Sequence, residues 1–388
     1  MNVSRDLKLP HRFGAYMLFD RIGQGGMAEI FLARRATELG GGKLLVVKLI
    51  LPVYAERAEF AEMLADEAKL AATLTHPNVV QIVDLGREEE RLFIAMEYVE
   101  GFDLAALLKR CSKEKVPLPP EFALHIVLEL LAGLDYAGKK KIVHRDVSPS
   151  NVLVSFDGEV KLCDFGIARA NDAIESPTEA IKGKAGYMSP EHARGEALDA
   201  RADVFAAGII LWELLAGRKL YRADAGDLIE QARTANVPDL APRGLPNEEA
   251  LFAIVKKALA PNRDERFASA GDFRRELHEW AISAKLVANP IKLGEWLTEH
   301  FGAELLAQRR ARETAAKALD PSPQPARAII ESPHIKYKEE KSPESLSPID
   351  VSPPSKSPPP TKEKSPPWTM IALGVVAIAV VAWLLVHR

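Results

Sequence analysis

The sequence is poor in several features that define other protein classes. It contains two cysteines among 388 residues, Cys111 and Cys163, which are too few for a disulfide framework, and it has no CxxC pair that would suggest zinc. Its net charge of −3 gives no support for a nucleic-acid-binding surface. The first residues, MNVSRDLKLPHRFG, include no apolar run, so no secretory signal peptide is expected. A reducing, cytosolic setting fits these absences.

What is present is typical of a globular chain with appended segments. Apolar residues make up 47% and charged residues 27%, enough for a sizeable core. Composition shifts predict five parts: an N-terminal tail over 1–12, an α+β domain over 13–283, a helical extension over 284–318, a linker over 319–367 and an apolar segment over 368–386.

The extension has the spacing of an amphipathic helix, which Pro290 is expected to open or kink. We expect this helix to pack on the preceding domain; binding a separate partner is the alternative. Its apolar residues at helical spacing are Leu293, Trp296, Leu297, Phe301 and Leu305.

The last two parts contrast in composition. Within 321–367, 13 of 47 residues are proline and Ser-Pro occurs seven times, which predicts a disordered tether. Residues 369–386 carry no charge, and at about 1.5 Å per residue they would cross a bilayer core of about 30 Å. We therefore expect the lipid bilayer as a partner: a single-pass transmembrane helix over 368–386 in the cell (inner) membrane, with the folded domain in the cytoplasm. A buried core helix is the alternative.

Glycines cluster between two apolar runs near the N-terminus. Gly23, Gly25 and Gly26 lie between YMLFDRIG and IFLARR, which predicts a hairpin whose tip lets backbone N–H groups approach phosphates. A plain β-hairpin is an equal alternative. Ala28 takes the third glycine position of the usual G-x-G-x-x-G pattern.

A lysine lies inside an apolar run that predicts a strand. Lys48 in LLVVKLI needs an ionic partner if it is buried. The helix predicted in FAEMLADEAKLAATLTHPNVV offers Glu67, with Glu62 and Asp66 as alternatives. The apolar face expected for this helix contains Phe60, Met63, Leu64, Leu70 and Leu74.

The run LFIAMEYVEGFDL contains a segment whose backbone could hold adenine, Met96-Glu97-Tyr98-Val99. Asp103 follows, and it is expected either to reach a ribose or to cap the next helix.

Three oxygen-bearing side chains lie on two predicted loops, Asp146 and Asn151 in HRDVSPSN and Asp164 in VKLCDFGIAR. Mg²⁺ prefers carboxylate and phosphate oxygens, so Asn151 and Asp164 are candidate metal ligands. Asp146 remains to accept a proton from a substrate hydroxyl. Each of the three, taken singly, would more often cap a turn.

Together with GKAGYMSPEHARG, these motifs occur in the order and at the spacing of one family. From Gly14 to about Leu286 the chain resembles eukaryotic-type protein kinases, and the sequences of its motifs are most similar to those of bacterial serine/threonine kinases. The resemblance implies the two-lobed α+β kinase fold, with a β-rich lobe to about Val99 and a helical lobe after it. It implies protein substrates, ATP between the lobes, Mg²⁺ as cofactor and γ-phosphate transfer to serine or threonine hydroxyls.

The resemblance also assigns roles around the nucleotide. The glycine loop should cover the phosphates, Lys48 should hold the α- and β-phosphates and pair with Glu67, and Met96 should be the gatekeeper. The implied nucleotide-binding residues are Ile22, Gly23, Gly25, Gly26, Ile30, Lys48, Glu67, Met96, Glu97, Val99 and Asp103.

Further roles concern the chemistry and its support. Asp146 should orient the acceptor hydroxyl, while Asn151 and Asp164 bind Mg²⁺. His144 and Phe165 should stack in the column of side chains that aligns the two lobes.

Two structural contacts of the large lobe are implied as well. Glu191 should pair with Arg266 in RDERF, and Asp203 should receive backbone N–H groups of the catalytic loop.

Two positions depart from the serine/threonine pattern. Ser148 stands where these kinases usually carry a lysine, and Lys184 maps to the hydroxyl residue of the P+1 loop. We therefore add both to the catalytic candidates. The hypothesis is that the ammonium group of Lys184, coming from the other loop, occupies the space that the usual lysine fills in serine/threonine kinases. The alternative is that Lys184 points to solvent.

Arg145 lies directly before Asp146. In the kinases that share this arginine, a phosphate on the activation segment neutralises it and orders that segment, so the resemblance implies the same for Asp164 to Glu191 here. Thr178 is the preferred autophosphorylation site and Ser176 the second choice. Glu175 or Glu179 could satisfy Arg145 instead.

Two rival functions stay open. One is a pseudokinase scaffold that binds nucleotide without transfer, and retention of Lys48, Glu67, Asp146, Asn151 and Asp164 speaks against it. The other is tyrosine specificity, which YMSPE disfavours.

Overall fold

The computed structural model describes residues 7–25, 27–35, 42–55, 58–165 and 185–318. The predicted linker and transmembrane helix lie outside these ranges, as do Gly26, Lys184, Ser176 and Thr178. Within these ranges, no helix is both long enough and apolar enough to cross a membrane.

The small lobe is built on an antiparallel sheet that has six strands within the described residues, in the order β1-β2-β3-β4-β6-β5. The sheet begins at His11, slightly before the predicted start of the domain. Phe13, Leu18, Phe31 and Val47 form part of its core. The elements of this lobe are β1 (His11–Phe13), β2 (Tyr16–Gln24), β3 (Ala28–Arg35), β4 (Leu44–Ile50), α1 (Pro52–Ala55), α2 (Ala58–Ala72), β5 (Ile82–Glu88) and β6 (Arg91–Glu97).

Helix α2 packs against the sheet through a stripe of mostly small residues. Its buried positions include Leu64, Ala68 and Ala71, which follow the i, i+4, i+7 spacing of one helical face. Leu70, by contrast, is 56% exposed, so the prediction that it lies on the apolar face is wrong. The reason is geometric, because adjacent helical residues point about 100° apart and Ala71 takes the buried direction.

The large lobe is helical and surrounds one central helix. Helix α8 is apolar along nearly its whole circumference, as expected for a helix buried on all sides, and it contacts α4, α10 and α11. A three-stranded sheet of β7, β8 and β9 lies in the same lobe. The main elements are β7 (Gly101–Asp103), α3 (Leu104–Glu114), α4 (Pro120–Lys139), β8 (Val152–Ser155), β9 (Val160–Leu162), α7 (Pro190–Ala193), α8 (Ala200–Ala216), α9 (Leu228–Thr234), α10 (Glu248–Ala258) and α11 (Ala270–Ser283).

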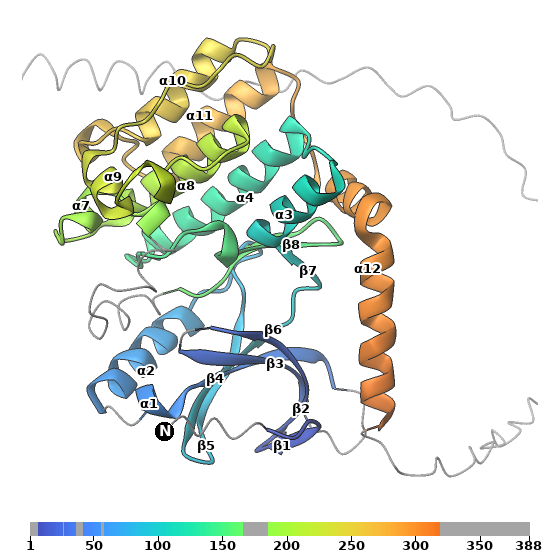
Figure 1. Cartoon of the computed structure of the whole chain (residues 1–388). Helices are drawn as coiled ribbons and strands as arrows, with labels where there is room; N and C mark the ends of the chain where they lie inside the picture. The colour runs from blue at the N-terminus through green and yellow to red at the C-terminus, as the bar shows by residue number, and fades with distance from the viewer. Residues whose placement is uncertain (1–6, 26, 36–41, 56–57, 166–184, 319–388) are drawn as a thin grey trace, which may run out of the picture. The chain divides into compact units, whose positions relative to one another are not determined.

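The predicted two-lobed kinase fold is confirmed. A lobe rich in strands precedes a helical lobe, and the chain passes from one to the other between β6 and β7 (Figure 1). The segment 98–100 that joins these two strands is called the hinge below.

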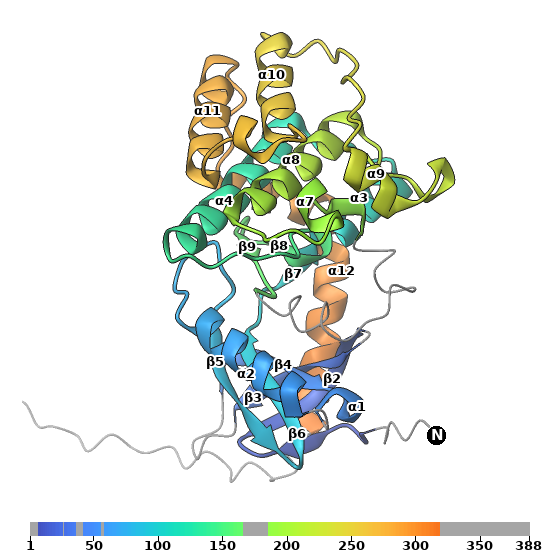
Figure 2. The same ribbon diagram turned by 90° about the vertical axis from the view of Figure 1, so that its left-hand side faces the viewer.

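The helical extension is present as α12 (Pro290–Ala318), and Pro290 is its first residue. The prediction that it packs on the domain is confirmed, because Leu293, Leu297, Phe301 and Leu305 are all buried in the core of the large lobe. Figures 1 and 2 both show α12 continuing from the helical lobe to the sheet, where it contacts β2.

Two glycines let the start of α12 approach the turn between β8 and β9. A Cβ atom on Gly158 would lie 1.7 Å from the carbonyl oxygen of Pro290, and one on Gly294 would lie 2.6 Å from that of Phe156. Gly158 also has φ +79°, a conformation that other residues rarely adopt. The close contact therefore fixes where α12 leaves the large lobe.

Candidate active site

The loop that carries Asp146 is held by a buried carboxylate from the central helix. Asp203 accepts the backbone N–H of His144 at 2.7 Å and that of Arg145 at 2.9 Å, as predicted. Arg145 has φ +68°, a left-handed conformation that costs about 1–3 kcal/mol and persists only where neighbours enforce it. Burial raises the pKa of Asp203, and the positive and N–H groups of the loop oppose that rise.

The rings of His144 and Phe165 pack together, which confirms the predicted contact between the two loops. Their centroids are 4.5 Å apart and the planes are tilted by 58°. The backbone N–H of Asp146 donates to Nδ1 of His144 at 3.2 Å, so Nε2 carries the proton and donates to the carbonyl of Cys163 at 2.8 Å. His144 therefore links the Asp146 loop to the Asp164 loop.

Asp146 and Asn151 lie within hydrogen-bonding distance of each other. The Asn151 amide nitrogen donates to the carbonyl oxygen of Asp146 at 2.7 Å and to its Oδ2 at 3.2 Å. This orients the carboxylate of Asp146 and assigns the remaining amide oxygen of Asn151 as the possible cation ligand. The backbone N–H of Cys163 donates to the Asn151 carbonyl at 2.9 Å, so the Asp164 loop is tied to the same residue.

Lys48 of the small lobe forms an ion pair with Asp164 of the large lobe. Its Nζ lies 3.0 Å from Oδ1 of Asp164, and the lysine is only 8% exposed. Asp164 has φ +63°, a second left-handed residue at this site. The structure thus provides the ionic partner that a lysine buried in a strand requires. Glu67 lies on α2, and its pairing with Lys48 stays a prediction.

The donor set suits Mg²⁺ held jointly with a phosphorylated ligand. Among the described residues, no group of three or more His, Cys, Asp or Glu side chains could hold a metal by itself. Mg²⁺ is usually bound through one or two carboxylates together with substrate phosphates and waters. Asn151 and Asp164 on loops joined by hydrogen bonds fit that mode.

The glycine loop forms the predicted hairpin between β2 and β3. The backbone N–H of Gly25 donates to the carbonyl of Ala28 at 2.8 Å. A Cβ atom on Gly25 would meet nothing nearer than 3.8 Å, so packing within the described chain does not require glycine there. Glycine would be required there if a ligand approached the backbone closely. Ile22 and Ile30 flank the hairpin, and Ile22 is 41% exposed.

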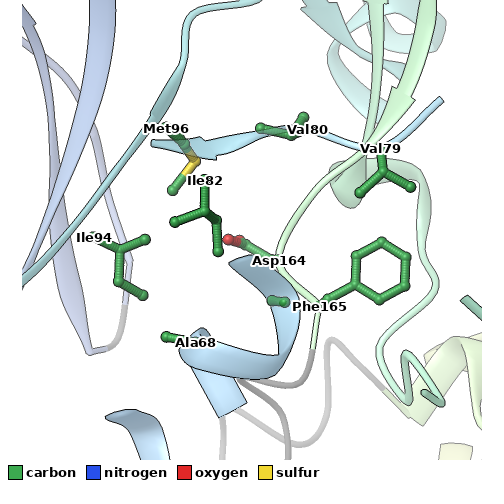
Figure 3. Close-up of a pocket in the computed structure, with 9 residues that line it drawn as sticks. Ala68, Val79, Val80, Ile82, Ile94, Met96, Asp164 and Phe165 are labelled. Carbon is green, nitrogen blue, oxygen red and sulfur yellow. The ribbon is translucent and has the colours of Figure 1, made fainter. Parts of the chain in front are cut away.

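A cavity of about 20 Å³, room for about one water molecule, lies beside Met96. In Figure 3, Met96, Ile94 and Ile82 of the sheet line one side, with Asp164 and Phe165 on the other. The position of Met96 fits the predicted gatekeeper.

Glu97, the last residue of β6, directly precedes the hinge, and its backbone N–H and its carboxylate are both engaged. Its backbone N–H donates to the carbonyl of Gln81 at 2.9 Å. Its carboxylate accepts from the Gln81 N–H at 2.8 Å and from Lys161 of β9 at 3.1 Å. The adenine contact predicted for the backbone of Glu97 and of the half-buried Val99 stays a prediction.

Asp103 caps helix α3, which confirms the alternative weighed for it. Its Oδ1 accepts the backbone N–H of Ala106 at 2.7 Å. A ribose contact through the other oxygen stays a prediction.

Ser148 lies close to Ser150, with 3.0 Å between the two hydroxyl oxygens, and it is 8% exposed. Because Lys184 is outside the described residues, the exchange of lysine and hydroxyl stays a hypothesis.

The predicted pair of Glu191 and Arg266 is confirmed as a buried, two-pronged ion pair. The two guanidinium nitrogens of Arg266 donate to the two carboxylate oxygens of Glu191 at 2.7 and 2.8 Å. The side chains are 0% and 3% exposed. This pair ties α7, at the end of the activation segment, to the body of the large lobe.

Several contacts of the hinge and of Glu97 just before it have no signal in the local sequence. Lys161 lies 64 residues from Glu97, while Arg309 and Arg312 of α12 reach Glu100 and Tyr98 across more than 200 residues. Nothing in the spacing of these charges distinguishes them from an ordinary solvated helix face.

Comparison with known proteins agrees with the geometry. Residues 16–276 match the protein kinase domain family. Tyrosine-protein kinase MasK of Myxococcus xanthus is 36% identical over 318 residues, covering 78% of this chain and 49% of that protein. Serine/threonine-protein kinase PknD of Mycobacterium tuberculosis is 36% identical over 276 residues, covering 69% and 40%. The chain thus spans less than half the length of these curated relatives.

A solved structure gives the same result. The kinase domain of Mycobacterium tuberculosis PknI superposes with a TM-score of 0.54 at 28% sequence identity, covering 70% of this chain and 97% of that one. Because the family match extends over most of the chain and carries the lobes and loops described above, this chain belongs to the protein kinase family.

Proposed function

We propose that this chain transfers the γ-phosphate of Mg·ATP to serine or threonine hydroxyls of proteins. The observation that carries the proposal is the joined pair of contacts at the lobe junction: Asn151 donating to Asp146, and Lys48 paired with Asp164. A pseudokinase would have no need to keep this whole set.

In the proposed reaction, Asp146 accepts the proton of the acceptor hydroxyl while the oxygen of that hydroxyl attacks the γ-phosphorus; the bond from the γ-phosphorus to the bridging oxygen breaks and ADP leaves. Lys48 and the glycine loop hold the phosphates in line, and the backbone of the hinge holds adenine. Mg²⁺, held by Asn151 and Asp164, would neutralise charge on the phosphate oxygens. Because the chemistry is mostly positioning, the rigid support from Asp203 and His144 matters as much as the reacting groups.

The test is transfer of labelled phosphate from ATP to a generic protein substrate, followed by phosphoamino acid analysis. We expect phosphoserine or phosphothreonine from the wild type and no label with Asp146→Asn. Nucleotide binding without any transfer by the wild type would show a pseudokinase instead.

Tyrosine transfer is the second candidate function. A relative that covers 78% of this chain is named a tyrosine-protein kinase, and Ser148 departs from the serine/threonine pattern. Phosphotyrosine as the main product of the same assay would establish this reading.

We also propose that the chain phosphorylates its own activation segment at Thr178 or Ser176, and that residues 368–386 anchor it in the cell membrane for signalling. The uncharged run of eighteen residues from 369 to 386 supports the anchor. The full chain should float with liposomes, whereas a chain ending at residue 367 should not. Equal flotation of the two would contradict the anchor.

A further inference from the structure

The C-terminal half of α12 contacts the hinge. The hinge residues Tyr98, Val99 and Glu100 lie between β6 and β7, and the proposed function assigns the backbone of Val99 to adenine. Two arginines of α12 contact the side chains on either side of Val99. This contact was not expected from the sequence and has no place in the reaction described above.

Arg312 holds Tyr98 in two ways. Its Nη1 donates to the Tyr98 hydroxyl at 2.5 Å, and its guanidinium carbon lies 5.0 Å from the centre of the tyrosine ring. The side chain of Arg312 is only 14% exposed, so water competes little for this contact. Burial raises the pKa of Tyr98, which keeps the hydroxyl neutral at physiological pH.

Arg309 holds the other side of the hinge through Glu100. Its Nε donates to the two carboxylate oxygens of Glu100 at 3.0 and 3.1 Å, and Arg312 adds a second positive charge 3.7 Å away. The carbonyl of Glu100 also accepts the backbone N–H of Phe156 in the large lobe at 3.0 Å. Glu100 is therefore fixed by its backbone to the large lobe and by its side chain to α12.

The helix that supplies these arginines has a firm base on the large lobe. Phe301 of α12 packs edge-on against Phe102, with ring centroids 6.0 Å apart. Arg110 of α3 forms a two-pronged ion pair with Glu304, five residues before Arg309, in which its Nε donates at 2.8 Å. Movement of the arginines relative to the large lobe is thereby restricted, and so is movement of the hinge that they hold.

We propose that Arg309 and Arg312 are positioning residues for the nucleotide: by fixing Tyr98 and Glu100, they hold the intervening backbone of Val99 in the geometry that binds adenine. The inference rests on the proposed nucleotide site. The arginines do not touch the reacting atoms, so removing them should weaken ground-state binding and leave the chemical step unchanged.

The experiment uses the full chain and the variants Arg312→Ala, Tyr98→Phe and their combination. We measure the dissociation constant of ADP by calorimetry, and KM for ATP together with kcat. Arg312→Ala should raise both the dissociation constant and KM about three- to tenfold, with kcat changed less than about twofold. Arg312 and Tyr98 contact each other, so their effects on binding should not add. The double variant should therefore bind ADP about as tightly as whichever single variant binds it more weakly.

Two further variants separate positioning from general destabilisation. Lys292→Ala removes a charge at the other end of α12, where the residue is exposed, and should leave nucleotide affinity unchanged. Arg309→Ala, together with Glu100→Gln as its partner variant, should reproduce the rise in KM. Melting temperatures of all variants show whether each remains folded at the assay temperature.

The possible failures are distinguishable. A wild-type chain that binds no nucleotide would overturn the proposed function and this inference with it. If the wild type binds but Arg312→Ala and Arg309→Ala bind equally well, only the positioning role is overturned. A fall in kcat at unchanged affinity, or strictly additive effects of Arg312→Ala and Tyr98→Phe, would overturn it too.

Discussion

Replacing Asp146 with asparagine is expected to lower kcat for phosphoryl transfer by about 10²–10⁴-fold, the range in which a positioned general base contributes. An amide cannot take the proton of the acceptor hydroxyl. It also keeps nearly the same shape, so the loop held by Asp203 should stay folded. The measurement is the steady-state rate with a protein or peptide substrate at saturating ATP.

The control for this variant concerns binding and charge. Asp146 does not hold the nucleotide in the proposed site, so the dissociation constant of ADP should change less than about threefold. Asp224→Asn removes the same charge from an exposed pair with Arg222 and should leave kcat unchanged. A variant Asp146→Asn that retains full kcat would show that this carboxylate is not the base.

Glu191→Ala is expected to lower the free energy of unfolding by about 3–5 kcal/mol, because it leaves the guanidinium of Arg266 buried without its counter-charge. The side chain of Arg266 is 0% exposed, and within the described part of the chain the acceptors that would remain are the carbonyl groups of Ala260, Pro261 and Arg201. Urea unfolding followed by tryptophan fluorescence measures the loss, since Trp212 is buried in the same lobe.

An exposed ion pair provides the comparison. Lys257 and Glu276 are 2.9 Å apart with side chains 43% and 45% exposed. Glu276→Ala should therefore cost less than about 1 kcal/mol. If Glu191→Ala and Glu276→Ala lowered the free energy of unfolding equally, burial would not be the reason that loss of Glu191 destabilises the protein.

The same pair predicts a pH dependence. Burial, the largest single effect, would raise the pKa of Glu191, but the hydrogen bonds and charge of Arg266, together with hydrogen bonds from the Glu191 backbone and Ser189, outweigh it, and the pKa lies below its ordinary value of 4.5. A carboxyl whose pKa is lowered by folding stabilises the protein above its unfolded pKa, and this stabilisation is lost as the pH falls through the folded pKa. The stability difference between the wild type and Glu191→Gln should thus be full at neutral pH and shrink below about pH 4.5.

Much of the active site could be predicted because its signals are local. Residue type and spacing predict the environment of three features. These are a lysine within an apolar strand, an aspartate and an asparagine five residues apart on one loop, and a helix that is apolar on all sides. The contacts of Asp203 and the pair of Glu191 with Arg266 were implied by the resemblance to protein kinases, and the structure confirms them.

Predictions were less successful where the spacing of residues was equally compatible with two orientations or two roles of a side chain. On α2, apolar residues occur on more than one side of the helix, so periodicity did not show that Ala68 and Ala71 face the sheet while Leu70 faces solvent. At Asp103, the same carboxylate suited a ribose or a helix cap, and the cap is what the structure contains.

By itself, the sequence determined the family, the order of the lobes and which residue types gather at the lobe junction, because these depend on short motifs and on apolar periodicity. Only the tertiary structure decided the partners: Asp164 beside Lys48, and the arginines of α12 on the hinge. The physical reason is that a charged side chain specifies the sign of its partner but not its place in the chain. That place is set by the packing of whole helices and sheets, as when the buried apolar face of α12 positions Arg309 and Arg312 beside Glu100 and Tyr98.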